Sequence, residues 1–293
     1  MILYSAIFAQ GVSRSIIASL APYGTPSGQF DRWHKVLALG AGWCILNGSR
    51  GIQPMANTNG RVIWEGFSPI DGAPIVLIAT GFTEKSSNRK TGDEIQTWIL
   101  RRDVNPVVAN NEGLDESICG GCPHRKINNG TCYVNVGQAP NSIWKCYTSG
   151  SGYDIISESE YTKLFSDRVL RMGSYGDPAM VPVEVWHKIL SSGVKNHTGY
   201  THQWNSEFAQ DFKGIVQASC DGLMDFVNAS SAGWKCFLVK PADVADPQGT
   251  AHCAASVEKG AKTTCASCHL CDGNSAHVVI NAHGKRGHKV MWN

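Results

Sequence analysis

The sequence predicts an α/β protein built on a mostly parallel sheet, and three observations support this fold class. Strand-like and helix-like segments alternate from about residue 155 onward, as in βαβ units. Three strand-like runs precede them, between residues 61 and 104. Polar residues follow several of the later strands, at the edge where the ligands of parallel sheets gather.

Composition limits the class of partner and the compartment. The chain has 293 residues and a formal charge of +2, so its bulk charge does not call for a nucleic-acid or membrane partner. No apolar run approaches the ~20 residues that span a bilayer. The apolar opening raises a signal-peptide interpretation, but the polar stretch QGVSRS interrupts it and no basic residue precedes it. We therefore expect a cytoplasmic protein with no membrane partner.

The first hundred residues divide into two parts. Residues 1–58 have few charges and no clear period, so they are an N-terminal extension without an assigned structure. Residues 61–82 predict a hairpin, because two β-type runs flank the turn sequence SPIDGAP. Residues 94–103 add a third strand. We expect a small β module over residues 59–104, followed by the main domain over residues 105–293.

The main domain carries strands, helices and polar strand ends. Residues 169–193 predict a strand, a Gly-Asp-Pro turn and a helix, and residues 221–233 predict a second helix. Further strands are expected within residues 196–204, 214–220 and 234–243, the last being the final strand. Tyr175, Asp177 and His202 come just after strands, as acid–base or ligand-orienting groups would. Asp177 can instead cap a helix, and His202 can instead be a hydrogen-bonded core residue.

Eleven cysteines are present, and seven of them form two groups. We call Cys119, Cys122 and Cys132 the loop cysteines, and Cys253, Cys265, Cys268 and Cys271 the C-terminal cysteines. The odd number of cysteines in the chain and the clustering of seven of them argue against a disulfide framework and favour a reducing compartment. Cys44, Cys146, Cys220 and Cys236 are interpreted as small buried apolar residues.

The spacing of the two groups indicates metal binding. The run C-x2-C-x2-C is typical of iron–sulfur proteins, whereas structural zinc usually takes two separated C-x2-C pairs. Four C-terminal cysteines would saturate a 4Fe–4S cluster, and three loop cysteines would leave one iron of a second cluster open. Two zinc sites, or one zinc ribbon formed by the two groups together, remain the alternative.

A turn over residues 86–93 offers a further candidate site. Asn88, Lys90 and Thr91 supply donors that could hold the phosphate or carboxylate of a cofactor. The sequence lacks a complete phosphate-binding loop, and a solvated hairpin turn is the alternative.

Several motifs together carry a family resemblance. They are SSNRKTGDEIQTWIL, SICGGCPHR, CYVNVGQAP, RMGSYGDPAMVP, GYTHQW and TTCASCHLCDG. In this order, over residues 60–285, they resemble a group of bacteriophage-encoded cysteine-rich proteins, which would place the chain in the host cytoplasm. That group is similar to radical S-adenosylmethionine (SAM) proteins. The resemblance implies a partial (β/α) barrel, a cysteine loop before the main βα units and an auxiliary C-terminal cluster. Radical SAM proteins typically use C-x3-C-x2-C, whereas the loop spacing here is C-x2-C-x9-C.

These observations lead to one main functional hypothesis and two alternatives. The chain is expected to be a radical-SAM-like iron–sulfur protein, in which Arg171, Tyr175, Asp177 and His202 face the open cluster. It would act on a small molecule or nucleotide-like substrate and receive electrons from a donor. We also expect both cysteine groups at the carboxyl ends of the strands. The alternatives are a non-catalytic electron-transfer protein and a zinc-stapled module that contacts nucleic acid through residues 122–126 and 283–289.

Overall fold

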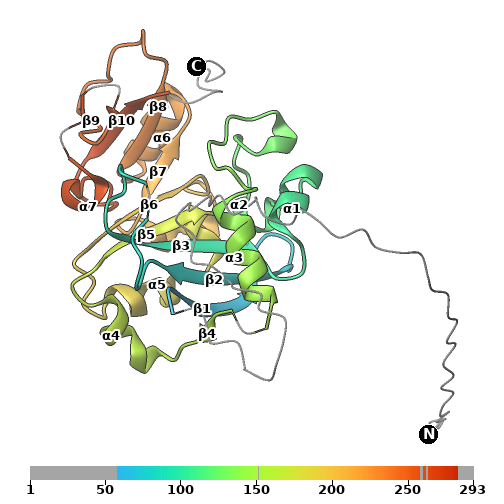
Figure 1. The fold of residues 1–293 in the computed structure, drawn as a ribbon. Coiled ribbons are helices and arrows are strands. Elements are labelled where there is room, and N and C mark those ends of the chain that lie inside the picture. The colour runs from blue at the N-terminus through green and yellow to red at the C-terminus, as the bar shows by residue number, and fades with distance from the viewer. Residues whose placement is uncertain (1–57, 87, 151, 258–259, 262, 283–293) are drawn as a thin grey trace, which may run out of the picture. The chain divides into compact units, whose positions relative to one another are not determined.

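The computed structural model describes residues 58–282, apart from 87, 151, 258, 259 and 262. These residues form a ten-stranded, mostly parallel sheet with helices packed against it, which confirms the predicted α/β class (Figure 1). The strand order is β4-β1-β2-β3-β5-β6-β7-β8-β10-β9. The expected N-terminal extension lies outside the described residues, except for Thr58.

The first strands form the predicted antiparallel hairpin and its third strand. They are β1 (Gly60–Phe67), β2 (Pro74–Thr80) and β3 (Glu94–Arg101). Gly72 at the hairpin tip has φ 70°, a conformation that glycine adopts without a steric cost. Because β3 also pairs in parallel with β5, the predicted β module is continuous with the rest of the sheet. The short β4 (Asp154–Ile155) pairs with β1.

The parallel part of the sheet begins with β3 and continues in chain order. Its next strands are β5 (Val169–Tyr175), β6 (Asn196–Thr201), β7 (Gln217–Cys220) and β8 (Cys236–Lys240). The expectation that β8 is the last strand was wrong. Two further strands, β9 (Thr250–His252) and β10 (His277–Asn281), extend the sheet, and β10 lies between β8 and β9.

Helices connect these strands. The α-helices are α1 (Pro106–Glu112), α2 (Glu116–Cys119), α3 (Ala139–Thr148), α4 (Tyr161–Phe165), α5 (Val183–Leu190), α6 (Leu223–Ser231) and α7 (Cys265–Cys268). Short 3-10 helices cover Lys126–Asn128, Glu158–Glu160, Pro178–Met180 and Glu207–Phe212. The predicted helices after β5 and β7 correspond to α5 and α6. None of the helices in the described part of the chain is both long and apolar enough to cross a bilayer.

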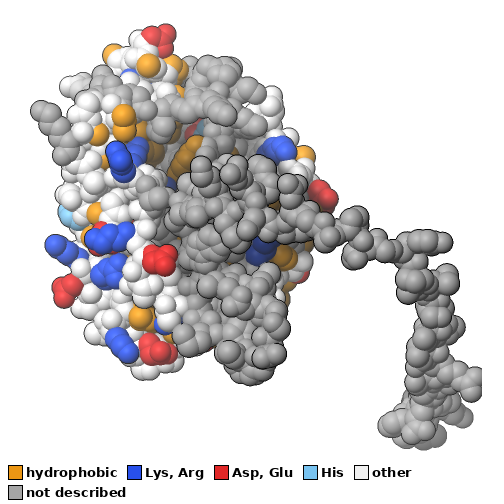
Figure 2. All heavy atoms as spheres, viewed as in Figure 1, with side chains coloured by type: hydrophobic (Ala, Val, Ile, Leu, Met, Phe, Trp, Pro, Cys, Tyr) orange, Lys and Arg blue, Asp and Glu red, His pale blue; other side chains and the backbone are white. Residues whose placement is uncertain are grey.

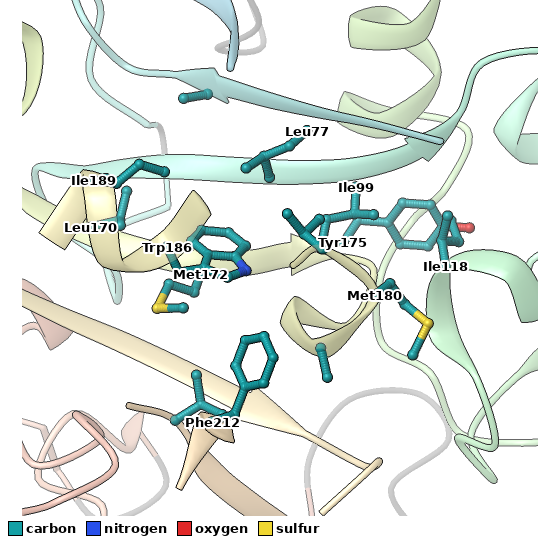
Figure 3. Close-up of a cluster of buried hydrophobic side chains, with 14 of the residues drawn as sticks. Leu77, Ile99, Ile118, Leu170, Met172, Tyr175, Met180, Trp186, Ile189 and Phe212 are labelled. Carbon is teal, nitrogen blue, oxygen red and sulfur yellow. The ribbon is translucent and has the colours of Figure 1, made fainter. Parts of the chain in front are cut away.

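One face of the sheet carries the main hydrophobic core. Alternate residues of a strand point to the same face, so Ile99, Leu170 and Met172 meet the helices that cover this side. Figure 3 shows them with Trp186 of α5 and Phe212 among the buried side chains. Trp186 is 0% exposed, and its Nε1–H donates to the carbonyl of Pro178 at 3.0 Å. This bond ties α5 to the turn that follows β5.

The other face of β3, β5 and β6 is polar. We call Glu94, Gln96, Arg171, Thr198 and Tyr200 the polar sheet face. Thr198 Oγ1 donates to Glu94 Oε1 at 3.4 Å, and Ser174 Oγ donates to Gln96 Oε1 at 2.5 Å, so neighbouring strands are linked across this face. Ionisable and amide groups are costly to bury in a purely structural sheet. This face is therefore a candidate binding surface.

Candidate metal centres

The loop cysteines lie at the carboxyl ends of the central strands, as predicted. The carbonyl of Ile118, next to Cys119, accepts from the backbone N–H of Asp177, which follows β5, at 2.7 Å. Gln203, which follows β6, donates from Nε2 to the carbonyl of Cys119 at 3.1 Å. Cys122 Sγ lies 4.0 Å from Nε2 of His202. The cysteine loop is thus held against the ends of β5 and β6.

The double glycine between Cys119 and Cys122 has a structural cause. Gly120 has φ 54°, and a Cβ built there would lie 2.4 Å from Oε1 of Gln203. The same Gln203 oxygen accepts from the N–H of Gly121 at 3.1 Å. Only glycine at position 120 allows this carboxamide to contact the loop closely.

The basic residues of the loop are engaged within the protein. Arg125 is buried, and its Nε donates to Asp115 Oδ1 at 3.0 Å. Lys126 Nζ donates to Asn111 Oδ1 at 2.5 Å. Because Arg125 already has a buried carboxylate partner, it is not free to contact a phosphate. On the visible part of the face in Figure 2, basic and acidic side chains are interspersed. The second proposed nucleic-acid contact, residues 283–289, lies outside the described residues.

Two histidines and an aspartate meet beside the loop cysteines. The ligand atoms of His124, His202 and Asp221 all lie within 4.8 Å of one another. His124 Nε2 is 2.6 Å from Asp221 Oδ1, and His202 Nε2 is 3.4 Å from Asp221 Oδ2. The sequence pattern predicts His202 as a site residue, but it does not identify His124 or Asp221. The signals were present, because Asp221 directly follows β7 and His124 lies in the cysteine loop.

The charges of this trio are coupled. Burial disfavours the imidazolium of His202, but hydrogen bonds to Asp221 and Cys122 outweigh it and raise the pKa of His202 well above its usual value. Burial likewise opposes ionisation of Asp221, yet hydrogen bonds from His124 and His202 lower its pKa. A protonated His202 beside an ionised Asp221 is the favoured state of the pair.

Asp177 and Tyr175 have different surroundings. Asp177 Oδ1 accepts from the N–H of Ala179 at 3.0 Å and Oδ2 from the N–H of His202 at 2.9 Å. Asp177 therefore caps the 3-10 helix that follows it and fixes the backbone of His202, so the helix-cap interpretation describes it. Tyr175 is buried and its hydroxyl has no hydrogen-bond partner among the described residues. Burial, together with the neighbouring Cys119, Asp115 and Cys132, raises the pKa of Tyr175.

Arg171 does not join this group. Its Nη2 donates to the hydroxyl of Tyr133, the residue after Cys132, at 3.0 Å, and it lines a cavity on the polar sheet face. Burial opposes its charge, but the neighbouring Tyr133, Tyr200 and Glu94 raise its pKa overall. The prediction that it would stand with Tyr175, Asp177 and His202 is therefore not met by this arrangement.

The structure also separates the three residues predicted to bind a cofactor. Asn88 lines the same cavity as Arg171. Thr91 is buried and donates to the carbonyl of Asn88 at 3.0 Å. Lys90 lines the cavity of the C-terminal cysteines, and its carbonyl accepts from the N–H of Cys265 at 2.7 Å. This turn serves as a docking point for α7, so the three side chains do not form one site.

The C-terminal cysteines converge as predicted. All four line one small cavity of about 30 Å³, although Cys253 follows β9 and the other three belong to α7 and the loop after it. Burial raises the pKa of Cys265 to about 11 and that of Cys271 to about 12, and thiols of the same group add to this. Tyr200 is hydrogen-bonded to Cys271, which favours the thiolate of Cys271. A positive ion at the centre would favour the thiolates and release protons on binding.

The position of this group differs from the expected one. The carbonyl of Cys271 accepts from the N–H of Gly199, within β6, at 3.2 Å. The backbone N–H of Cys265 donates to the carbonyl of Lys90, which precedes β3. The C-terminal cysteines therefore lie over the polar sheet face rather than at the carboxyl ends. The prediction was wrong here because the long β9–β10 connection returns across the sheet.

The remaining cysteines stand apart from both groups. Cys220 and Cys236 are buried and free, as predicted. Cys146 is buried in α3, as predicted, but it is disulfide-bonded, which the expected reducing compartment did not predict, so it is not available as a fourth ligand for the loop cysteines. Cys44 lies outside the described residues.

Glu94 gives the polar sheet face a pH dependence that can be tested. Its side chain is 2% exposed, Oε2 has no partner among the described residues, and burial raises its pKa from 4.5 to about 7. Because the pKa of Glu94 is higher in the folded state than in the unfolded state, its protonated carboxyl stabilises the fold at low pH. This stabilisation is lost as the pH rises from 4.5 to about 7. We expect Glu94→Gln to exceed the wild type by about 3 kcal/mol in unfolding free energy at pH 8 and by little at pH 4.5.

Urea unfolding at the two pH values measures this difference. Glu84→Gln, at an exposed glutamate nearby, is the matched control and should give no pH-dependent gain. An equal gain for Glu94→Gln at both pH values would assign the effect to packing instead of ionisation.

Comparison of the chain with protein-family models, with curated proteins and with solved structures found no match.

Proposed function

We propose that this chain is an iron–sulfur protein with a radical-SAM-like arrangement. In this proposal the C-terminal cysteines hold one 4Fe–4S cluster, and the loop cysteines hold another cluster with one open iron. A small-molecule substrate would bind at the open iron, and an electron donor would reduce the protein.

The observation that carries the proposal is the convergence of Cys253, Cys265, Cys268 and Cys271 on one cavity. The raised pKa values keep Cys265 and Cys271 protonated at neutral pH while no cation is bound. A cationic cluster core would favour the thiolates and release these protons on binding. The C-x2-C-x2-C spacing gives the same indication from the sequence.

The C-terminal thiols are not gathered as closely as the ligands of a single zinc ion. Zinc with Zn–S bonds of about 2.3 Å holds tetrahedral sulfurs about 3.8 Å apart. Among the described residues, no three cysteine Sγ atoms lie within 4.8 Å of one another.

The surroundings of the loop cysteines support a bound group there as well. Tyr175 is buried beside Cys119 and Cys132 with a hydroxyl that has no partner among the described residues. A hydroxyl in this position costs free energy unless it meets an acceptor. A sulfide or a ligand at the open iron would provide one.

The chain's own residues have distinct tasks in this proposal. A reduced cluster, when bound, supplies one electron to a ligand. His202, held by Asp177 through its backbone and by Asp221 through its ring, offers a proton or a hydrogen bond near Cys122. His124 completes the polar wall through its own bond to Asp221. The sequential parallel strands and the cysteine loop at their carboxyl ends are the features that favour a radical-SAM-like fold, a partial barrel included.

Anaerobic purification with iron, zinc and sulfide analysis tests the cluster assignment. We expect iron and acid-labile sulfide in the wild type. Cys265→Ala should lose about half of both if two clusters are present, because one ligand of a saturated cluster is removed. Cys236→Ala changes a cysteine outside both groups and is the matched control, with unchanged iron and sulfide.

Two results would contradict the proposal. Zinc at near-stoichiometric amounts without sulfide rules out a cluster at both groups. Unchanged iron and sulfide in Cys265→Ala rules out the ligand assignment for the C-terminal cysteines.

The His124–His202–Asp221 trio favours a second candidate, a zinc protein. Two imidazoles and a carboxylate within 4.8 Å of one another, with Cys122 Sγ 4.0 Å from His202, suit a mononuclear zinc site. The same metal analysis decides between the two candidates. In the zinc protein His124→Ala would lower the zinc content, whereas in the iron–sulfur protein it would leave iron and sulfide unchanged.

A further inference from the structure

A second cavity on the polar sheet face has no part in either cysteine group. It measures about 280 Å³ and opens between β3, β5, residues 84–86 with Asn88, and the segment at residues 133–143. This volume is at the lower end of the range of small-molecule sites, so it suits a ligand no larger than a single nucleotide.

One buried donor in this cavity has no partner. Gln96 is 7% exposed, and its Oε1 accepts from Ser174 Oγ at 2.5 Å. Its Nε2 is buried with no hydrogen-bond partner among the described residues. An unpaired amide N–H in such a place costs about 1–3 kcal/mol unless a ligand supplies an acceptor. Gln96 lines the cavity, so a bound ligand can supply it.

The same cavity holds a positive charge, Arg171, whose charged neighbour Glu94 is not close enough to form an ion pair. Arg171 donates to Tyr133 Oη, and in the described part of the chain no carboxylate lies within 4.0 Å of its guanidinium. The other charged lining residues are Glu84 and Lys85, both exposed, and Lys85 is paired with Asp93 at 2.8 Å. A guanidinium fork with free donors matches the geometry of a phosphate or carboxylate.

The remaining walls combine aromatic rings with carboxamides. Trp98, Tyr133 and Tyr153 line the cavity, and the indole of Trp98 is fixed by a 2.8 Å bond from Nε1 to Thr80 Oγ1. Asn135 and Gln138 also line it. Aromatic faces stack on nucleobases, and carboxamides offer a donor and an acceptor that match a base edge.

We propose that this cavity binds a nucleoside monophosphate, with Arg171 at the phosphate and Gln96 donating to an acceptor on the ligand. The aromatic rings and carboxamides would hold the base. The assignment rests on the cavity alone and needs no metal in either cysteine group, so it can fail or hold independently of the iron–sulfur proposal.

Isothermal titration of the full chain tests this site with the 5′-monophosphates of adenosine, guanosine, cytidine and uridine. The corresponding nucleosides and inorganic phosphate are the comparison ligands. We expect at least one monophosphate to bind, and both its nucleoside and phosphate to bind at least tenfold more weakly. Arg171→Gln should weaken binding about 10- to 100-fold, because a charged hydrogen bond is lost.

Three further variants locate the site. Gln96→Leu removes the unpaired donor and should weaken binding several-fold. Ser142→Trp places a large ring in the cavity from an exposed position on α3, so it should block binding without disturbing the core. Arg102→Gln changes an arginine bonded to Tyr147 and Glu65, outside the cavity, and is the matched control with unchanged affinity.

Each outcome of these titrations either supports or overturns the proposed nucleotide site. Loss of binding in Ser142→Trp and Arg171→Gln, with Arg102→Gln intact, supports the site. Absence of binding for all four monophosphates overturns the proposal. Equal affinity in Ser142→Trp and the wild type places the ligand elsewhere and also overturns it. Inorganic phosphate that binds as tightly as the nucleotides overturns the assignment of the rings and carboxamides to a base.

Discussion

Replacing Trp186 with alanine is expected to lower the free energy of unfolding by about 3–5 kcal/mol. The indole is 0% exposed and lies in the core between the sheet and α5 (Figure 3). Its removal leaves a cavity that the surrounding side chains cannot fill without moving, and it leaves the carbonyl of Pro178 without its donor. Urea unfolding followed by circular dichroism measures the change.

Two comparisons make this prediction specific. Trp186→Phe keeps most of the ring volume and loses the bond to Pro178, so it should cost less than the alanine variant. Trp144→Ala removes an indole that is only half-buried but makes a similar bond, from Nε1 to the carbonyl of Arg101 at 2.9 Å. It should cost clearly less than Trp186→Ala. Equal losses at the two tryptophans would show that burial of Trp186 does not govern its contribution.

Local pattern explains why much of the fold could be predicted. The hairpin of β1 and β2 has two β-type runs around an Asp-Gly turn, and α5 has an apolar stripe after a Gly-Asp-Pro turn. Such signals lie within about ten residues of one another. β10 was missed because HVVIN is a short apolar run, which has no period long enough to identify it. β9 has only three residues.

The site was predictable where cysteines recur at short spacing and where single residues follow strands. His202 was found by this rule, and Asp221 satisfies the same rule but was not singled out. The pairing of His124 with Asp221 joins residues 97 positions apart, and the docking of Cys265 on Lys90 joins two distant loops. These contacts depend on how the loops return over the sheet, which no local pattern encodes. The same reason explains the wrong placement of the C-terminal cysteines.

The second prediction with a large expected effect is that cleavage of SAM depends on the loop cysteines. If the iron–sulfur proposal holds with SAM as the ligand, anaerobic protein reduced with dithionite should release methionine and 5′-deoxyadenosine from SAM. One electron from dithionite breaks the bond between sulfur and C5′, and the resulting nucleoside fragment takes a hydrogen atom from a donor. Cys122→Ala should abolish this release while leaving the iron and sulfide of the C-terminal cysteines in place, because Cys122 belongs to the other group. Chromatography of the quenched reaction measures both products.

The matched variants determine what a negative result means. Cys236→Ala lies outside both groups and should release 5′-deoxyadenosine at the wild-type rate. His202→Gln keeps a polar group beside Cys122 but cannot carry the charge that Asp221 stabilises, so it should slow the release without lowering iron content. If the wild type contains both clusters and yet releases nothing, SAM is not the ligand of the open iron. The spacing C-x2-C-x9-C would account for that result, because a loop of this geometry need not direct the open iron toward the same ligand as C-x3-C-x2-C.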